Sequence, residues 1–336
     1  MTDMILAGDI GGTNTRLAVF AITRGRLLMR ERSDFRNAGR EGLAPIVREF
    51  LAPLKLKIKL ACFGVAGPVK DGRAKLTNLE WSFDERKLPK SLKIPRVALI
   101  NDLVAHAEGI NELRPKDLVT LQRGVAVKHG NRAIIAPGTG LGEAGLVFDP
   151  RSNDYRAYAS EGGHSDFAPT DDRQIALMSF IRARTGGRCS WEDVLSGPGL
   201  KHVYEFIALP GRFHVESTYP GADARPAEIS EAAMKSECKA AIASTELLAT
   251  LYGAEAGNLA LKTLATGGVY IGGGIANYIL KFLKHARVRE AFTRKGPPSI
   301  QQLLSRMPIH VITSDGALLG AAHYAQRLLT EVRVKR

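Results

Sequence analysis

A glycine-rich segment near the start of the chain has the composition of an anion-binding loop. Residues Gly8 to Asn14 read Gly-Asp-Ile-Gly-Gly-Thr-Asn. Successive glycines let the backbone approach a ligand and turn N–H groups toward an anion, and Asp9 could hold Mg²⁺ through water. The segment is not a P-loop, because no Gly-Lys-Ser/Thr follows it. Taken alone, it fits a plain hairpin turn equally well.

A second glycine-rich turn follows the apolar run Ala133 to Ala136. Gly140 to Gly145 matches G-x-G-x-x-G, and Glu161 lies about 20 residues further on, as a dinucleotide-binding fold requires. That fold also needs a helix after the loop, whereas the residues up to Phe148 predict a strand. We therefore interpret the turn as a second phosphate-binding hairpin, and an NAD site would rest on this match alone.

Candidate acid–base chemistry lies in Asn101-Asp102, directly after the predicted strand Val97 to Ile100. Ligands of open α/β sheets bind at the carboxyl ends of strands. A carboxylate there can accept the proton of a hydroxyl that attacks phosphorus. Asp102 also precedes a predicted helix, and Asp at that position is commonly an N-cap. The two roles are compatible.

The segment Glu161-Gly162-Gly163-His164 carries side chains that can hold the hydroxyls of a small polar ligand. His164 could instead be a zinc ligand, but no cysteine cluster supports that interpretation. The non-functional alternative is an ordinary exposed loop. Glu192 lies in Ser190-Trp-Glu-Asp193, which resembles a capping box. Taken alone, Glu192 is better explained by the helix dipole than by a ligand.

These residues need an α/β scaffold to position them. Predicted strands alternate with helices, and a strand–glycine turn–strand unit occurs twice, which indicates two related lobes with a central cleft. A third glycine cluster, Gly267 to Gly274, brackets a short strand. It could make room for adenosine, or it could serve close strand–helix packing.

Composition excludes several other classes. The chain has 336 residues, three separated cysteines and a formal net charge of +13. The length favours two lobes, and the sparse cysteines favour a reducing compartment, so we expect a cytoplasmic protein. No leader-like segment and no run of about 18 apolar residues is recognisable, so we expect neither a signal peptide nor a membrane span. The basic residues are dispersed, which favours a solvated surface over a nucleic-acid partner.

Eight motifs in order resemble bacterial glucokinase over nearly the whole chain. They are Gly8–Asn14, Gly64–Val69, Thr77–Trp81, Ile100–Asp102, Gly138–Gly142, Glu161–His164, Ser196–Leu200 and Gly267–Gly274. The resemblance implies an actin/hexokinase-like (ribonuclease H-like) α/β fold that closes on the sugar. Its small lobe would span residues 1–110 and be rejoined by a C-terminal helix at 315–330, and the large lobe would span 111–314.

The resemblance also implies roles for individual residues. Asp102 would be the catalytic base in ATP-dependent phosphorylation of glucose. The glucose hydroxyls would be bound by Asn78, Asn101, Asp102, Glu161, His164 and Glu192. ATP and Mg²⁺ would be bound by Gly8, Asp9, Ile10, Gly11, Gly12, Thr13, Gly138, Thr139, Gly267 and Gly268, with Asp9 reaching the metal through water. Such enzymes are usually homodimers.

Two alternatives remain at this point. Residue types do not distinguish glucose from another hexose, because hydroxyl geometry decides between them. A non-catalytic sugar sensor could keep the same fold, although the presence of Asp102 speaks for an enzyme. The basic charge and the turn-rich segment from Pro210 to Pro226 have no role that the sequence explains.

Overall fold

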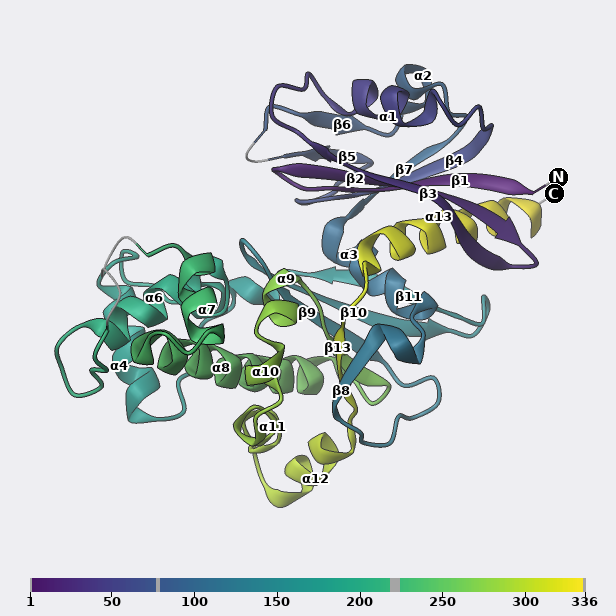
Figure 1. Cartoon of the computed structure of the whole chain (residues 1–336). Helices are drawn as coiled ribbons and strands as arrows, with labels where there is room; N and C mark the ends of the chain where they lie inside the picture. Colours follow the sequence, from purple (N-terminus) through teal and green to yellow (C-terminus); the bar gives the residue numbers. More distant parts are fainter. Residues whose placement is uncertain (1, 77–78, 218–223, 335–336) are drawn as a thin grey trace. The chain divides into compact units, whose positions relative to one another are not determined.

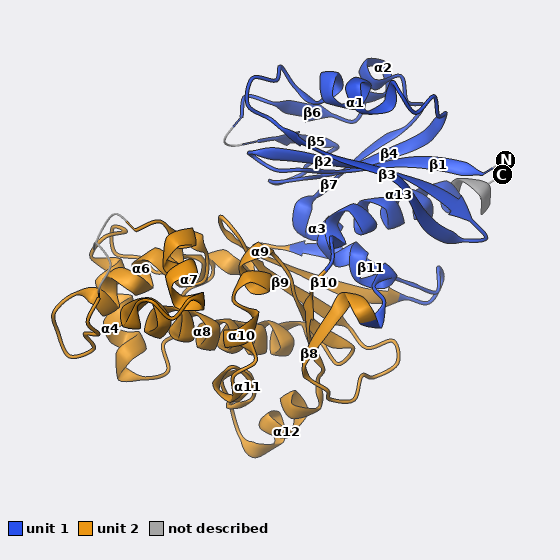
Figure 2. Cartoon of the chain, in the orientation of Figure 1, with its two compact units in different colours: residues 1–115, 149–159, 314–336 blue, residues 116–148, 160–313 orange. Residues whose placement is uncertain are grey.

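The structure is a computed structural model that describes residues 2–76, 79–217 and 224–334. It divides into two compact units, one of residues 1–115, 149–159 and 314–336 and the other of residues 116–148 and 160–313 (Figures 1 and 2). The sequence placed 149–159 in the large lobe, whereas this segment groups with the first unit. None of the helices in the described ranges combines the length and hydropathy that a membrane crossing requires.

The first unit is built on a five-stranded sheet in the order β3-β2-β1-β4-β7. β1 pairs antiparallel with β2 and parallel with β4, and β4 pairs parallel with β7. The strands of the unit are β1 (Asp3–Ile10), β2 (Asn14–Thr23), β3 (Arg26–Arg36), β4 (Ile58–Val65), β5 (Arg73–Lys75), β6 (Ser82–Asp84), β7 (Val97–Asn101) and β11 (Asp154–Ser160). Its α-helices are α1 (Leu43–Leu51), α2 (Leu88–Leu92), α3 (Asp102–Gly109) and α13 (Gly316–Val334).

Alternation along β1 provides this sheet with two buried faces. Leu6 and Ile10 pack in a cluster with α1 and α2, whereas Ile5 and Ala7 pack in another with α3 and α13. Successive strand residues point to opposite faces, so a continuous apolar run is required when helices cover both. Figure 1 shows α1 and α13 on opposite faces of this sheet.

The second unit repeats this pairing. Its strands follow the order β10-β9-β12-β13-β8, with β9 antiparallel to β10 and parallel to β12, and β12 parallel to β13. They are β8 (Leu118–Gln122), β9 (Arg132–Pro137), β10 (Leu141–Asp149), β12 (Gly268–Ile271) and β13 (Ile309–Ile312). The same antiparallel hairpin and parallel neighbours therefore occur in both units, as the repeated strand–turn–strand pattern predicted.

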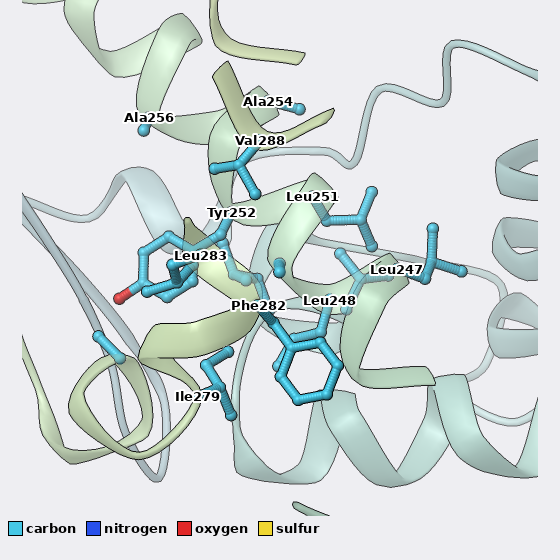
Figure 3. Close-up of a cluster of buried hydrophobic side chains, with 14 of the residues drawn as sticks. Leu247, Leu248, Leu251, Tyr252, Ala254, Ala256, Ile279, Phe282, Leu283 and Val288 are labelled. Atoms are coloured by element: carbon cyan, nitrogen blue, oxygen red, sulfur yellow. The ribbon is translucent and has the colours of Figure 1, made fainter. Parts of the chain in front are cut away.

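Helices surround the second sheet, and the longest of them, α8, supplies much of the core. The α-helices are α4 (Asp172–Arg182), α5 (Trp191–Val194), α6 (Gly197–Ala208), α7 (Pro226–Met234), α8 (Lys239–Thr263), α9 (Gly274–Tyr278), α10 (Leu280–Leu283), α11 (Ala286–Thr293) and α12 (Pro298–Arg306). Figure 3 shows α8 residues Leu248, Leu251 and Tyr252 among Ile279 and Phe282. Because α8 is apolar on most sides, it is a buried helix.

The strand β3 is the clearest element that the sequence did not predict. Nearly all of its residues are exposed or half-buried, and arginines and acids interrupt its apolar residues. It pairs with β2 over its whole length, from Asn14 opposite Arg36 to Thr23 opposite Arg26. An edge strand with charged residues gives no two-residue hydrophobic period, so pairing with a neighbour decides its structure.

Candidate functional site

The first glycine turn is shorter than the motif that contains it. Gly8, Asp9 and Ile10 belong to β1, and only Gly11 to Thr13 connect β1 with β2. Gly8 is buried, and a Cβ atom there would lie 2.4 Å from Phe63 Cδ1, so packing explains this glycine. Ile10 is buried as well, and its carbonyl accepts a hydrogen bond from the Ala66 N–H at 2.9 Å.

Asn37 fixes the turn itself. Its side-chain amide donates to the Gly11 carbonyl at 2.8 Å, and its backbone N–H donates to the Thr13 carbonyl at 2.9 Å. The side-chain oxygen of this buried residue accepts from the Thr15 hydroxyl at 2.7 Å. The turn is thus preorganised before any ligand arrives, which lowers the entropic cost of binding.

Asp9 lies in a charged network on the strands that flank this turn. Arg16, its cross-strand neighbour in the β1–β2 register, approaches Asp9 Oδ2 at 2.7 Å with one nitrogen and Asp315 Oδ2 at 3.1 Å with the other. Burial raises the pKa of the Asp9 carboxyl, and the positive charge of Arg16 opposes that rise. Burial lowers the pKa of the neighbouring His106, whose Nδ1 has no hydrogen-bond partner among the described residues.

Asn101, and not Asp102, caps helix α3. Its side-chain oxygen accepts from the N–H groups of Leu103 at 2.9 Å and Val104 at 3.2 Å. Its amide nitrogen donates to the Gly67 carbonyl at 3.1 Å and to Asp102 Oδ1 at 2.9 Å. Asn101 therefore does the capping that the sequence also allowed for Asp102, and it orients the Asp102 carboxylate at the same time.

The surroundings of Asp102 suit a general base. Burial, followed by the negative charge of Asp9, raises the pKa of Asp102 to about 6. The first turn of α3 lies close to β4, because a Cβ atom at Gly64 would be only 2.9 Å from the Ala105 Cβ. A carboxyl with a pKa just below neutral is ionised at physiological pH yet more basic than an ordinary aspartate.

The second glycine turn is fixed by hydrogen bonds to helices α5 and α6, which follow it in sequence. Glu192 Oε2 accepts from the Leu141 N–H at 2.8 Å, and the Gly138 carbonyl accepts from the N–H of Gly197, the first residue of α6, at 2.9 Å. A Cβ atom at Gly140 would lie 2.4 Å from Glu192 Oε2, whereas one at Gly138 would meet no atom within 4 Å. After the turn the chain continues as β10, in agreement with our interpretation of the G-x-G-x-x-G match.

The three polar residues Glu161, His164 and Glu192 come together in the second unit. His164 Nε2 lies 3.9 Å from Glu161 Oε2, and His164 Nδ1 lies 3.9 Å from Glu192 Oε1. The side chains of Glu161 and His164 are 77% and 65% exposed, so they are available to a ligand. Glu192 lies on α5, where Ser190 and Asp193 form the predicted capping box and leave Glu192 for Leu141 and His164.

The third glycine cluster lies at the two ends of β12. Gly267 and Gly268 lie at the amino end of β12, where a Cβ atom at Gly267 would be 2.3 Å from the Gly130 carbonyl. The glycines at the carboxyl end, Gly272 to Gly274, lie about 13 Å further along the strand. There the Gly272 N–H donates to Ile135 at 2.9 Å, beside the strand that enters the second turn. Close packing therefore explains Gly267, whereas the positive φ of 119° explains the glycine at Gly268. Their contact with adenosine stays a prediction.

The carboxyl end of β12 is supported from the core. The Tyr252 hydroxyl, which Figure 3 shows among the side chains of α8, donates to the Gly272 carbonyl at 3.1 Å. A Cβ atom at Gly273 would lie 2.6 Å from the Pro137 carbonyl, so β12 and β9 approach closely where both strands end. Adjacent carboxyl ends of parallel strands are the usual ligand-binding edge of an α/β sheet.

Some site residues could not be recognised from the sequence, and one lies outside the structure. Arg16, Asn37, His106 and Asp315 lie at the first turn or beside Asp102 and belong to no glycine motif, whereas Glu143 lies inside the Gly140–Gly145 match but was given no role there. His106 alone had a signal, since it lies four residues after Asp102 on the same helix face. Asn78 lies outside the described residues.

The residues near Asp9 fit a magnesium ion that is held largely by other ligands. Asp315 Oδ1 is buried without a hydrogen-bond partner among the described residues, and carboxylate oxygens are what this hard cation prefers. Among all the residues that the structure describes, no three His, Cys, Asp or Glu side chains come together as a metal site. This donor set suits Mg²⁺ bound through water and phosphate oxygens.

Comparison with known proteins agrees with this geometry. The glucokinase family model matches residues 6–328. A glucokinase of Nostoc sp. is 36% identical over 97% of this chain and 99% of its own length, and that of Psychromonas ingrahamii is 34% identical over 98% and 99%. The crystal structure of a glucokinase from an Antarctic psychrotroph has a TM-score of 0.85 at 32% identity, over 97% of this chain and 99% of that one.

The fold extends to more distant sugar kinases. A glucokinase of the ROK family from Streptomyces griseus, solved in complex with glucose and AMPPNP, has a TM-score of 0.62 at 22% identity, over 96% of this chain and 99% of that one. The mixed α/β units described above are thus those of the actin/hexokinase-like fold. The extent of the family match and the identity to curated relatives place the chain in the glucokinase family.

Proposed function

We propose that this chain transfers the γ-phosphate of Mg-ATP to the 6-hydroxyl of D-glucose, with Asp102 as the general base. The observation that carries the proposal is the Asp102 carboxyl at the start of α3. Asn101 caps the helix and orients this carboxyl, whose Oδ1 also accepts from the Leu103 N–H at 3.0 Å. Burial and the charge of Asp9 give it a pKa of about 6. Family membership supplies the class of reaction, and this carboxyl supplies its base.

In the proposed step the sugar oxygen attacks phosphorus while Asp102 accepts the hydroxyl proton. The bond from the oxygen to the γ-phosphorus forms, the bond from that phosphorus to the bridging β,γ-oxygen breaks, and ADP leaves with the bond electrons. Magnesium near Asp9 neutralises phosphate charge when it is bound. The protein's own work is to hold the hydroxyl in line and to keep water away.

Substrate groups are assigned by chemistry. Glu161, His164 and Glu192 bind sugar hydroxyls, because carboxylates and imidazole provide acceptors and a donor in fixed places. Asn101 and Asn78 are further sugar contacts in this proposal. The nucleotide phosphates bind at Gly11 to Thr13, beside Asp9, and at Gly138 and Thr139. Adenosine binds near the carboxyl end of β12, at Gly272 to Gly274.

Substitution of the base tests the proposal directly. Asp102→Asn keeps the size and the Asn101 contact but accepts no proton, so we expect kcat to fall by about 10²–10⁴-fold. Glucose binding, followed by the fluorescence of buried Trp191 beside Glu192, should stay within about threefold of the parent value. Near-normal kcat in this variant would refute the role of Asp102.

Two further assays define the remaining parts of the proposal. Coupled assays with glucose, mannose and fructose measure the preference for glucose, and a higher kcat/KM for another hexose would overturn the assigned acceptor. The proposed homodimer is tested by sedimentation equilibrium of the full chain, in which a monomer at micromolar concentration would contradict it.

A further inference from the structure

The sugar-binding segment Glu161 to His164 lies directly on strand β10. A Cβ atom at Gly163 would lie 2.1 Å from the Leu141 carbonyl, and one at Gly162 would lie 1.9 Å from Glu143 Oε2. Real Cβ atoms do not come this close to another heavy atom, so Gly163 requires glycine, and a side chain at Gly162 would force the Glu143 carboxyl to move. The two glycines between Glu161 and His164 therefore seat the segment on β10, one of them against the side chain of Glu143.

Glu143 is an unusual residue to find beneath a binding segment. It is 1% exposed, and neither of its carboxyl oxygens has a hydrogen-bond partner among the described residues. The charge that acts on it most strongly is that of another carboxyl, Glu255 on α8, which is 0% exposed. Glu255 accepts from the Asn258 amide at 2.7 Å and lies 3.4 Å from Lys262 Nζ, so its own interactions are largely satisfied.

We propose that Glu143 is a positioning residue for sugar binding: its buried carboxyl supports Gly162 and so holds Glu161 and His164 in place. This inference rests on the proposed function, because it assumes that the Glu161–His164 segment binds the sugar. Glu143 itself is too deeply buried to contact a ligand. It acts through Gly162, whose N–H is held by the Ser160 hydroxyl at 3.0 Å.

The support that Glu143 gives depends on its charge. Burial, followed by the negative charge of Glu255, raises the pKa of Glu143 to about 8. The charged groups that act on the pair Glu143 and Glu255 are Lys262 of α8 and Lys295, which follows α11. On its other side Glu143 is covered by Gly162. At pH 7 the Glu143 carboxyl is mostly neutral. At pH 9 it is mostly a carboxylate, which is repelled by the charge of Glu255 and is unfavourable in a buried position without hydration.

The inference predicts that glucose affinity falls at alkaline pH and that Glu143 is the cause. If the ionised form binds glucose poorly, the glucose KM of the parent enzyme should rise about tenfold between pH 7 and pH 9. Glu143→Gln keeps the shape without the charge, so its glucose KM should change less than about twofold over this range. The KM for ATP should change equally in both proteins.

A second readout does not depend on glucose. The amide N–H groups of His164 and Ser165 are bonded to the carbonyls of Glu161 at 3.0 Å and Gly162 at 2.9 Å. Deuterium exchange of the peptide that contains them should accelerate from pH 7 to pH 9 in the parent, after correction for the intrinsic rate. The corrected exchange should stay constant in Glu143→Gln. Glu143→Ala should exchange faster at both pH values.

Leu146→Ala is the matched control, because Leu146 is a fully buried residue of the same strand. It creates a cavity away from the segment and should leave the pH dependence of glucose KM as in the parent. Identical pH profiles for the parent and Glu143→Gln, in both KM and exchange, would overturn the inference. Loss of glucose phosphorylation in the parent would overturn the proposed function instead, while exchange still reports on Glu143.

Discussion

The two glycine hairpins share a backbone plan and differ in electrostatics. In each, an antiparallel pair of strands is joined by a three-residue turn, Gly11 to Thr13 or Gly138 to Gly140, and the first strand continues the sheet through parallel neighbours. The β1–β2 hairpin carries the ion pair between buried Asp9 and partly exposed Arg16. The β9–β10 hairpin instead carries Glu143, a buried carboxyl without a cationic partner at hydrogen-bond distance among the described residues.

This difference separates two tasks. The charged hairpin contains Asp9, whose negative charge raises the pKa of Asp102, so in the proposed function it would act on phosphate, metal and base together. The turn of the second hairpin is fixed by Glu192 and Gly197, so in the proposed function this hairpin would provide shape for the segment Glu161 to His164. One backbone motif can thus serve electrostatics or geometry, depending on the side chains that flank it.

The largest effect that would sharpen this comparison is expected at Asp9. Asp9→Asn removes the negative charge beside the first turn and leaves Arg16 with Asp315 alone. We expect kcat to fall by at least about 10²-fold in a coupled assay with ATP and glucose, because the proposed phosphate site loses the preorganised charge of Asp9. Asp34→Asn is the control, since this exposed acid belongs to the same network of arginines and acids. Comparable losses of kcat in Asp9→Asn and Asp34→Asn would show that the charge of Asp9 has no special role at the first turn.

The pH dependence of catalysis probes the same hairpin. Because the pKa of Asp102 is raised to about 6, the base is protonated and inactive below that pH. We expect kcat/KM for glucose to fall about tenfold per pH unit below this value and to level off near neutrality. A profile that stays flat down to pH 5, with the protein folded by circular dichroism, would remove Asp102 from the role of base.

A pair of alanine substitutions compares two positions of the second turn. Gly140→Ala would push its methyl group into Glu192, so we expect the glucose KM to rise about tenfold while the ATP KM changes little. The new methyl group of Gly138→Ala would meet no neighbouring protein atom and would contact only a bound phosphate. This variant should therefore raise the ATP KM instead. The reverse pattern of KM values would show that the two turn positions are assigned to the wrong substrates.

Glu143 is also expected to affect the stability of the fold. The pKa of Glu143 in the fold is about 8, above that of the unfolded chain, so its neutral form favours folding at low pH. This contribution is lost as the pH rises toward 8, at up to about 1.4 kcal/mol per pH unit. Glu143→Gln should therefore lose less thermal stability than the parent between pH 5 and pH 8 in scanning calorimetry. Parallel curves would indicate that Glu143 is not neutral in the fold.

Much of the fold and part of the site could be predicted from the sequence. The buried strands β4, β7 and β9 were recognisable because apolar runs record burial on both faces. Asp102 was recognisable because an acid that follows such a strand is placed at the ligand-binding edge. By contrast, β3 was missed because its side chains are largely exposed. Among the residues described for the hydrophobic clusters, only Leu27 and Phe35 of this strand pack against them, so pairing with β2 decides that it is a strand.

The sequence by itself determined the two glycine turns, the candidate base and the family, since these depend on residue types at short spacing. Only the tertiary structure decided which glycines pack against remote segments. Gly267 meets Gly130, Gly140 meets Glu192 and Gly162 meets Glu143, in each case across a distance in sequence. It also decided the charge of Glu143 and the basicity of Asp102. Burial and neighbouring charges set both, and these arise only when remote segments pack together.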